Sequence, residues 1–567
     1  RSDLTSTLAG AAIKLMATAN LTSDTAANTI TTNGGAVVLT SDTDGSGAGR
    51  IYISTSGLTI DTRTGLTGSK STAGTGGGSI TLAGGDLLGS GYAIGDTSTS
   101  AGGITSDGYL GLFSGGGDIA MRGKSWSGAV GSGYQAWGIA HWATAGFVAD
   151  SGVGKIYLEG ISRSSGTSSY KIGISTYYGV DLKSAYAGAD AIKLIGSSTS
   201  TGAGWNHGVD LGTGNEGYSS ATYQRLTASG VGGGISIIGT ANEWSVLIRN
   251  GTQLLTNGGP LTIKAGGVGA GGTNSSLYLR NGSTQWWGSA ASSAVTSTSS
   301  NLLLEFDTFN FSGYPNIATN GTVTWQSTTP TFGSAIDTNW FAWNTNNTTM
   351  TGLTLGKTGN NQAVGVSTTD ITVAGPITVY GGDITLNRSL SSTASGADIF
   401  LKALGSITQA SNVSVSTVGG DVTYWADSDS TNGGFIWLKS GSRITTTSAA
   451  GNIVLSGGNV ADVAALASTG YASGMTTTMG NGITIDAASL YSFGGNITLR
   501  GKSATTATSY TSSDGTTSNA NGIRVHGSVT MDAAAGKLNL WGVGQSATGS
   551  SNGIELSMLT TSTSVYK

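Results

Sequence analysis

The chain has 567 residues, of which 95 are glycine, 4 are proline and none is cysteine, and its formal net charge at pH 7 is −4. This composition excludes collagen, which needs glycine at every third position, and it excludes disulfide frameworks and Cys-ligated metal sites. A hydrophobic fraction of 37% excludes a disordered Gly/Ser linker. The small charge leaves no basic surface for nucleic acid. No window approaches about eighteen consecutive apolar residues, so no transmembrane segment is expected.

A short unit recurs along the chain: one or two glycines, a variable residue, and an apolar-x-apolar triplet. The alternation predicts short strands with one face turned inward. The glycines before each triplet supply the positive φ or the close backbone approach that a corner needs. The clearest examples cover residues 77–82, 116–121, 154–158, 233–237, 384–386, 399–401, 422–424, 436–438 and 453–455.

A longer segment that contains this unit is also duplicated. Residues 116–125 nearly repeat as residues 494–503, and each copy then runs through a polar loop to a Gly-Ile pair, Gly138-Ile139 or Gly522-Ile523. Such an internal superrepeat is typical of solenoid architectures.

The predicted fold is all-β: a right-handed parallel β-helix (β-solenoid) with loops of variable length and roughly 20–30 residues per coil. Strands this short are unstable alone, but stacked coils pair their backbones and bury a continuous core. A propeller would need longer strands at a fixed period, which is absent. Helical periodicity is confined to one short stretch, residues 459–468.

Three regions are expected along the chain. All four prolines lie between Pro260 and Pro376, and between them the repeat weakens while aromatic residues become more frequent. We therefore expect the N-terminal half of the β-helix rod over 1–284, irregular aromatic-rich coils or an inserted lobe over 285–350, and the C-terminal half of the rod over 351–567.

The C-terminal half carries a resemblance to a known family. Its motifs are ordered Gly-Gly-Asp and Gly-Asn segments, each leading into an apolar-x-apolar triplet, at 380–386, 396–403, 405–408, 419–424 and 450–458. Their recurrence resembles the repetitive rod of filamentous-haemagglutinin-like and other giant bacterial surface proteins. The resemblance implies a β-helical rod, export to the cell surface, and adhesion or cell–cell contact; it carries over no binding residue.

An extracellular location is expected from the composition as well, and the resemblance implies that this is a bacterial cell surface. A chain of this length without cysteine suits a secreted protein that avoids thiols able to mispair. The chain opens on Arg1 without an initiator Met, so we expect it to be a processed part of something longer. Identical subunits, other surface proteins or glycans are the expected partners.

No catalytic or cofactor-binding residues are predicted. The three histidines, His141, His207 and His526, are too scattered for metal-ligand spacing. The segments 42–45 and 427–429 faintly resemble calcium loops but depart from the EF-hand pattern, so turn capping is favoured over a surface Ca²⁺. A β-helical polysaccharide-degrading enzyme would need several carboxylates on outward strand positions. We find one, Glu555, and therefore predict a non-enzymatic protein.

A further pattern concerns the residue directly before a strand. An Asp or Asn precedes many strands and is predicted to form a structural ladder by binding neighbouring backbone amides. This set comprises Asp118, Asp383, Asp398, Asp421, Asn452 and Asn496.

Aromatic residues are the remaining candidates for function, because exposed rings on a weakly charged protein mark contact surfaces. The alternative is that the rings pack under loops or cover corners, and Trp126, Trp137, Trp142 and Trp205 of the N-terminal half share this ambiguity. The predicted contact surface comprises Trp286, Trp287, Trp340, Trp343, Phe400, Trp425 and Trp437.

The sequence thus predicts a stiff β-helical spacer of a bacterial surface adhesin, whose loops and outward rings make the contacts. A self-assembling filament or matrix subunit is the alternative, because an uncapped solenoid end exposes strand edges that invite stacking.

Overall fold

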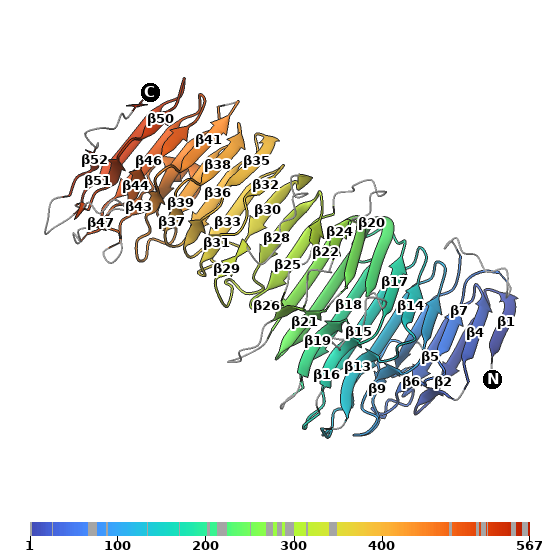
Figure 1. The fold of residues 1–567 in the computed structure, drawn as a ribbon. Coiled ribbons are helices and arrows are strands. Elements are labelled where there is room, and N and C mark those ends of the chain that lie inside the picture. Colours follow the sequence, from blue (N-terminus) through green and yellow to red (C-terminus); the bar gives the residue numbers. More distant parts are fainter. Residues whose placement is uncertain are drawn as a thin grey trace. The chain divides into compact units, whose positions relative to one another are not determined.

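The computed structural model describes residues 3–24, 26–65, 76–86, 89–132, 134–168, 170–200, 205–212, 224–249, 251–267, 276–280, 286–289, 300–312, 316–338, 349–448, 450–475, 479–505, 510–511, 517–518, 520–545, 551–557 and 565–566. The chain divides into two compact units, Arg1–Asn320 and Gly321–Lys567. Strands account for 53% and helix for 2% of the structure. In each unit the strands stack as successive parallel rungs (Figure 1). The predicted all-β, parallel β-helical fold is confirmed.

The first unit has three rows of parallel strands. One row contains β1 (Leu4–Ala9), β4 (Asn28–Asn33), β7 (Leu58–Asp61), β11 (Leu110–Phe113), β14 (Phe147–Asp150), β17 (Val180–Ser184), β20 (Arg225–Ala241), β22 (Gln253–Gly266), β24 (Trp286–Ser289) and β27 (Asn316–Ala318). The second contains β2 (Ile13–Met16), β5 (Val37–Ser41), β8 (Ile80–Gly84), β9 (Ala93–Ile94), β12 (Ile119–Lys124), β15 (Ile156–Ser162), β18 (Ile192–Ser198), the long strands β20 and β22, and β25 (Leu302–Phe306). The third contains β3 (Leu21–Ser23), β6 (Ile51–Ile53), β10 (Ile104–Ser106), β13 (Gln135–His141), β16 (Tyr170–Thr176), β19 (Trp205–Leu211), β21 (Trp244–Ile248), β23 (Leu277–Arg280) and β26 (Phe309–Ser312).

The second unit repeats this plan. Its first row contains β28 (Thr322–Gln326), β30 (Gly352–Leu355), β33 (Ile377–Gly381), β36 (Ile399–Ala403), β39 (Val422–Ala426), β42 (Ile453–Gly457), β43 (Ala472–Ser473), β46 (Ile497–Lys502) and β51 (Leu538–Val543). The second contains β29 (Ile336–Asp337), β31 (Val364–Val366), β34 (Ile384–Leu386), β37 (Ile407–Gln409), β40 (Ile436–Leu438), β44 (Ile483–Asp486), β49 (Ile523–His526) and β52 (Ile554–Ser557). The third contains β32 (Ile371–Val373), β35 (Leu390–Ser395), β38 (Ser414–Val418), β41 (Arg443–Thr447), β45 (Ser489–Tyr491), β50 (Thr530–Asp532) and β53 (Val565–Tyr566).

Two elements lie outside these rows. Strands β47 (Tyr510–Thr511) and β48 (Thr517–Ser518) form a short antiparallel pair. The helix α1 (Val463–Ser468) is capped at its N-terminus by Asp462, whose side chain accepts a hydrogen bond from the amide of Ala465. It falls within residues 459–468, where the sequence predicts the one helical stretch.

The core of each unit is a set of apolar columns. The first residue of each triplet stacks in register on the triplet of the next coil, and these side chains are fully buried. Burying each such side chain contributes about 1.5–3 kcal/mol. Examples are the column Ile119, Ile156, Ile192 and Ile235 in the first unit and the column Ile377, Ile399, Val422, Ile453 and Ile497 in the second.

Coil length is more variable than the predicted 20–30 residues. Register partners on adjacent coils are 22 and 23 residues apart at Ile377, Ile399 and Val422, within the predicted range, and 37 and 36 residues apart at Ile119, Ile156 and Ile192. Hydrogen bonds between adjacent coils of the second unit span 23, 31, 44 and 41 residues. The prediction therefore holds for some coils and is too short for others, because the loops between the strands of a coil differ in length.

The stretch 285–350 contains strands that belong to the regular rows. Strands β24 to β27 continue the parallel pairing of the first unit. Strands β28 and β29 pair in parallel with β30 and β31 of the second unit. The division at Asn320 and Gly321 falls inside this stretch.

In each copy of the superrepeat, the backbones of the duplicated segment and of the Gly-Ile pair pass so close that no side chain fits between them. A Cβ atom on Gly123 would lie 2.1 Å from the carbonyl oxygen of Gly138, and one on Gly501 would lie 2.2 Å from that of Gly522. Side-chain atoms do not approach backbone oxygens this closely, so both positions need glycine. The duplicated motif and the Gly-Ile pair that follows it therefore form one packing unit, and the same close approach recurs on neighbouring coils, at Gly160 with Gly173 in the first unit and at Gly542 with Gly553 in the second.

The predicted Asp/Asn ladder is confirmed. Each of its six members accepts a hydrogen bond through a side-chain oxygen from a backbone amide on the next coil, at 2.7–3.0 Å. A second ladder lies at three Asn-Gly-Ile segments, 481–483, 521–523 and 552–554, where Asn481 accepts from the amide of Asn521 and Asn521 accepts from that of Asn552. These side chains satisfy amides at corners, where no strand partner exists.

Candidate functional site

The described aromatic residues predicted to form a contact surface divide between the two units, with Trp286 and Trp287 in the first and Phe400, Trp425 and Trp437 in the second. Trp286 begins β24 and pairs in register with Gln253 and Asn316. Trp287 is 1% exposed and stands between Leu254 and Ile317 in the core. Its predicted place at a contact surface is wrong, because strand alternation turns it inward. Trp340 and Trp343 lie outside the described residues.

The three aromatic residues of the second unit have a different outcome. Trp425 is on the outer side of its sheet, but α1 covers it, and it packs against Val454 and Leu466 at 3% exposure. Its prediction as a contact residue is wrong, and the alternative of packing under a loop holds. Phe400 is half-buried against the same cluster. Trp437 is half-buried, and its indole Nε1 donates to Asp486 at 2.8 Å.

The structure does bring aromatic residues together on the first unit, on the row that contains β13, β16, β19, β21 and β23. Ring centroids of successive neighbours lie 3.9–6.2 Å apart, as in stacked and edge-to-face pairs. We call this set the aromatic strip; it comprises Trp137, Trp142, Tyr170, Tyr177, Tyr178, Trp205, Trp244 and Tyr278.

The rings of the aromatic strip lie outside the main core, although Trp137, His207 and Trp244 are only two positions before residues of the buried inner column. Strict alternation is broken between the two columns, where the strand pairing skips Gly138, Gly173 and Gly208, and Trp137 packs with Ala140 and Ile172 in a separate cluster. The inner face carries the buried column Ile139, Ile174, Val209 and Val246. Tyr278 lies in the neighbouring column, which alternation turns outward. Trp137 is buried beneath the other rings, and the remaining members are half-buried.

A buried charged cluster supports the aromatic strip from below. The Arg249 guanidinium donates from Nε and Nη2 to the two carboxylate oxygens of Asp210 at 2.9 and 2.8 Å, and Nδ1 of His207 lies 3.1 Å from the same carboxylate. All three side chains are buried. Burial alone would raise the pKa of Asp210, but the charge of Arg249 and the hydrogen bonds from Arg249 and His207 hold this pKa well below its usual range.

Rings of the strip enclose this cluster. The rings of Trp205 and Trp244 lie 5.7 and 4.7 Å from the His207 ring, and the Arg249 guanidinium carbon lies 5.5 Å from the Trp205 ring centre. The ion pair therefore fixes the positions of two rings of the strip.

The aromatic strip could be found in the sequence only from rings that recur at equivalent positions of successive coils. Trp137, Trp142 and Trp205 are noted as ambiguous from sequence, whereas Trp244 and the tyrosines are missed. Tyr170 and Trp205 occupy equivalent positions of adjacent coils, as do His207 and Trp244. An alignment of the coils would have brought them into one column, but their loops differ too much in length for the repeat alone to give that alignment.

The three histidines occupy separate places. His207 belongs to the cluster under the strip, and His526 faces Asp486 with its Nδ1 3.7 Å from the carboxylate. His141 is 2% exposed in the apolar interior, in contact with the ring of Phe147. This burial lowers the pKa of His141 from 6.5 to about 4, so the imidazole is neutral near pH 7.

The burial of His141 predicts that acid destabilises the first unit. Below pH 6.5 the unfolded chain binds a proton that the folded chain rejects, so the free energy of unfolding falls with pH until about pH 4. The free energy of unfolding lost over this pH range is about 3 kcal/mol. Denaturant unfolding at several pH values should show this loss, and His141→Leu should remove it. Equal pH slopes for the two proteins would contradict the assignment.

The two Asp-rich loops are turn-capping structures, as predicted. The Asp42 carboxylate accepts hydrogen bonds from the hydroxyl of Ser46 and the amides of Gly47 and Ala48. Asp429 accepts from the amide and the hydroxyl of Thr431. Burial, with a smaller contribution from the Asp429 charge, raises the pKa of Asp427 to about 6.

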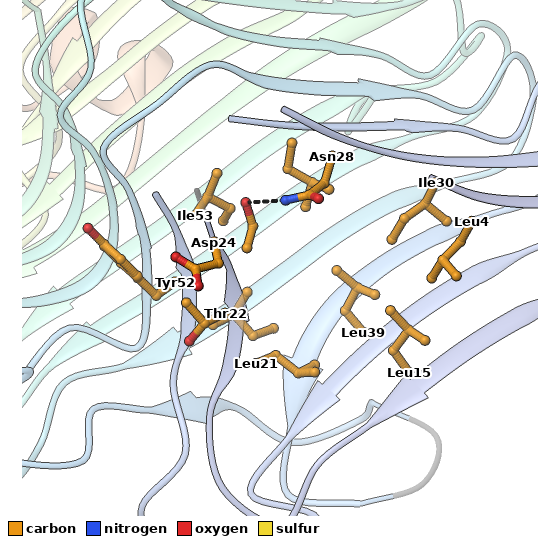
Figure 2. Close-up of a pocket in the computed structure, with 13 residues that line it drawn as sticks. Leu4, Leu15, Leu21, Thr22, Asp24, Asn28, Ile30, Leu39, Tyr52 and Ile53 are labelled. Carbon is orange, nitrogen blue, oxygen red and sulfur yellow. Dashed lines mark hydrogen bonds between the residues drawn. The ribbon is translucent and has the colours of Figure 1, made fainter. Parts of the chain in front are cut away.

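The first coil has an open apolar interior. A pocket of about 270 Å³ lies between β1, β2 and β3 and the next coil, and Leu4, Leu15, Ile30 and Leu39 line it (Figure 2). Within the described residues, β1, β2 and β3 each pair with a strand on one side, β4, β5 and β6 respectively. Large apolar side chains are exposed on this coil, among them Leu4, Leu8 and Met16.

Comparisons with protein-family models, with curated proteins and with solved structures find no match to this chain. Among the described residues, no helix has the length and apolar character needed to cross a membrane.

Proposed function

We propose that the chain is a non-enzymatic β-helical spacer of an extracellular bacterial surface protein, and that the aromatic strip makes its adhesive contacts. The observation that supports this most directly is the continuous outward strip of Trp and Tyr rings on stacked strands. Tyr, Trp and Arg dominate binding energy at interfaces. The resemblance to filamentous-haemagglutinin-like rods supports the cell-surface part of the proposal.

The strip is well prepared for binding. Its rings already contact one another and rest on strands that are paired on both sides, so little side-chain entropy remains to be lost on association. Tyr and Trp also offer large contact areas at low conformational cost. Because the net charge is only −4, we expect adhesion that depends little on salt.

Beads coated with the purified chain provide the test. We expect them to adhere to bacterial cells or to an immobilised polysaccharide, and the combined variant Trp142→Ala, Trp205→Ala and Trp244→Ala to lose at least tenfold in retention. The matched control is Trp541→Ala, which removes a tryptophan that is 56% exposed in the second unit. Equal retention of the strip variant, with an unchanged circular dichroism spectrum, would contradict the proposal. Release of product from the same polysaccharides would contradict its non-enzymatic part.

A self-assembling filament is the second candidate. Within the described residues the strands of the first coil pair on one side only, and such edges accept further parallel strands, whether from a second copy or from other coils of the same protein. The last described coil also exposes apolar side chains, Ile554 and Leu556. Electron microscopy over a range of concentrations distinguishes the candidates: polymers that lengthen with concentration and are lost in Leu8→Asp support the filament, whereas isolated particles at all concentrations support the spacer.

A further inference from the structure

A second candidate site lies at a corner of the second unit. A pocket of about 230 Å³ opens where β30, β33, β36, β39 and β42 end, and each of these successive rungs contributes to its wall. We call it the corner pocket; the residues used below are Asn360, Tyr380, Lys402, Ser428 and Asn459.

One charged side chain lines the corner pocket, that of Lys402. Its ammonium nitrogen lies 3.8 Å from the ring centre of Trp425, and no carboxylate among the described residues forms an ion pair with it. Burial lowers the pKa of Lys402, with no acidic neighbour contributing to the shift. The pocket thus holds a partly desolvated cation whose charge no anion of the protein balances, and such a cation favours an anionic ligand.

The other walls combine polar groups with apolar surface. Ser428 is 7% exposed, and its hydroxyl has no hydrogen-bond partner among the described residues, so a ligand or water oxygen reaching it would relieve a buried unsatisfied group. Asn360 forms a rigid wall, because its amide donates to the carbonyl oxygens of Gln362 and Tyr380. Tyr380 and the exposed Asn459 add a ring and a carboxamide.

We propose that the corner pocket binds a sugar residue that carries one carboxylate, such as a hexuronate, with the carboxylate against Lys402. A single ammonium matches a single negative charge, whereas phosphate groups are usually held by several cations or by a guanidinium fork. The ring of Tyr380 and the hydroxyl and carboxamide groups match a ligand with one apolar face and polar edges. This proposal is independent of the aromatic strip, which lies in the first unit.

Calorimetric titration of the full chain tests the proposal with three probes: glucuronate, glucose and acetate. We expect glucuronate to bind at least tenfold more tightly than either of the others. Lys402→Met and the milder Lys402→Gln should each weaken glucuronate binding at least tenfold. Lys439→Met is the matched control, because Lys439 stands in the same way over a tryptophan, 4.3 Å from the ring centre of Trp437, but does not line the pocket.

Each of the other outcomes would overturn the proposal. Equal binding of glucose would show that the pocket does not recognise the carboxylate. Equal binding of acetate would show that it does not recognise the sugar ring. Unchanged binding by both Lys402 variants, with circular dichroism spectra like that of the unmodified chain, would place the ligand elsewhere. The strip variant should keep full glucuronate binding, so a failure of the adhesive proposal and a failure of this one are distinguishable.

Discussion

Replacing Gly160 by alanine is expected to destabilise the first unit by about 3 kcal/mol or more, which is at or above the upper end of ordinary overpacking. A Cβ atom at this position would lie 2.0 Å from the carbonyl oxygen of Gly173. That oxygen belongs to β16, which is paired with β13 on one side and β19 on the other, so it has no direction in which to move. Denaturant unfolding measures the loss.

Gly266→Ala is the matched control, since a Cβ atom on Gly266, at the end of β22, meets nothing within 4 Å. It should change the unfolding free energy by no more than about 0.5–1 kcal/mol. If Gly160→Ala were as stable as this control, the close backbone crossing that explains the superrepeat would be refuted.

Asp210→Asn is expected to cost about 3–5 kcal/mol, because it leaves the buried charge of Arg249 without its carboxylate. The same substitution at Asp181, whose ion pair with Lys183 is partly exposed, should cost less than about 1 kcal/mol. Adding Arg249→Met to Asp210→Asn should restore part of the lost free energy of unfolding, since it removes the uncompensated charge. Equal costs at Asp210 and Asp181 would contradict the buried cluster.

The same pair predicts a pH dependence. The pKa of Asp210 is held below its unfolded value, so its contribution to stability is complete above about pH 4 and is lost as pH falls further. Asp210→Asn should remove this component of acid unfolding. Tryptophan fluorescence follows it conveniently, because Trp205 and Trp244 contact the cluster.

The β-helical fold could be predicted from the sequence because the strand pattern and the glycine positions both indicate it. Short alternating triplets predict strands, and the glycines before them predict corners. At Gly494-Gly495 both expected uses of glycine occur together, since the first residue has φ +112° and a Cβ atom on the second would lie 2.2 Å from the carbonyl oxygen of Gly451. The ladder residues were found in the same way, because each precedes a strand directly.

The candidate surface was harder to predict, since it depends on which coil stands beside which. Outward rings can be listed from alternation, but a loop that covers one of them lies elsewhere in the sequence. Trp425 shows this: its cover is α1, and Leu466 is far from it along the chain. The aromatic strip is hard to predict for another reason. Its rings come from five strands joined by loops of unequal length, so the sequence does not show which rings are neighbours.

The most direct test of the adhesive proposal is to footprint the tryptophans while the protein is bound. The full chain would be labelled by hydroxyl radicals, free and attached to the surface that retains the coated beads. We expect labelling of Trp142, Trp205 and Trp244 to fall severalfold on attachment, while labelling of the exposed Trp541 stays constant. Undiminished labelling of the three strip residues in the attached protein would contradict it.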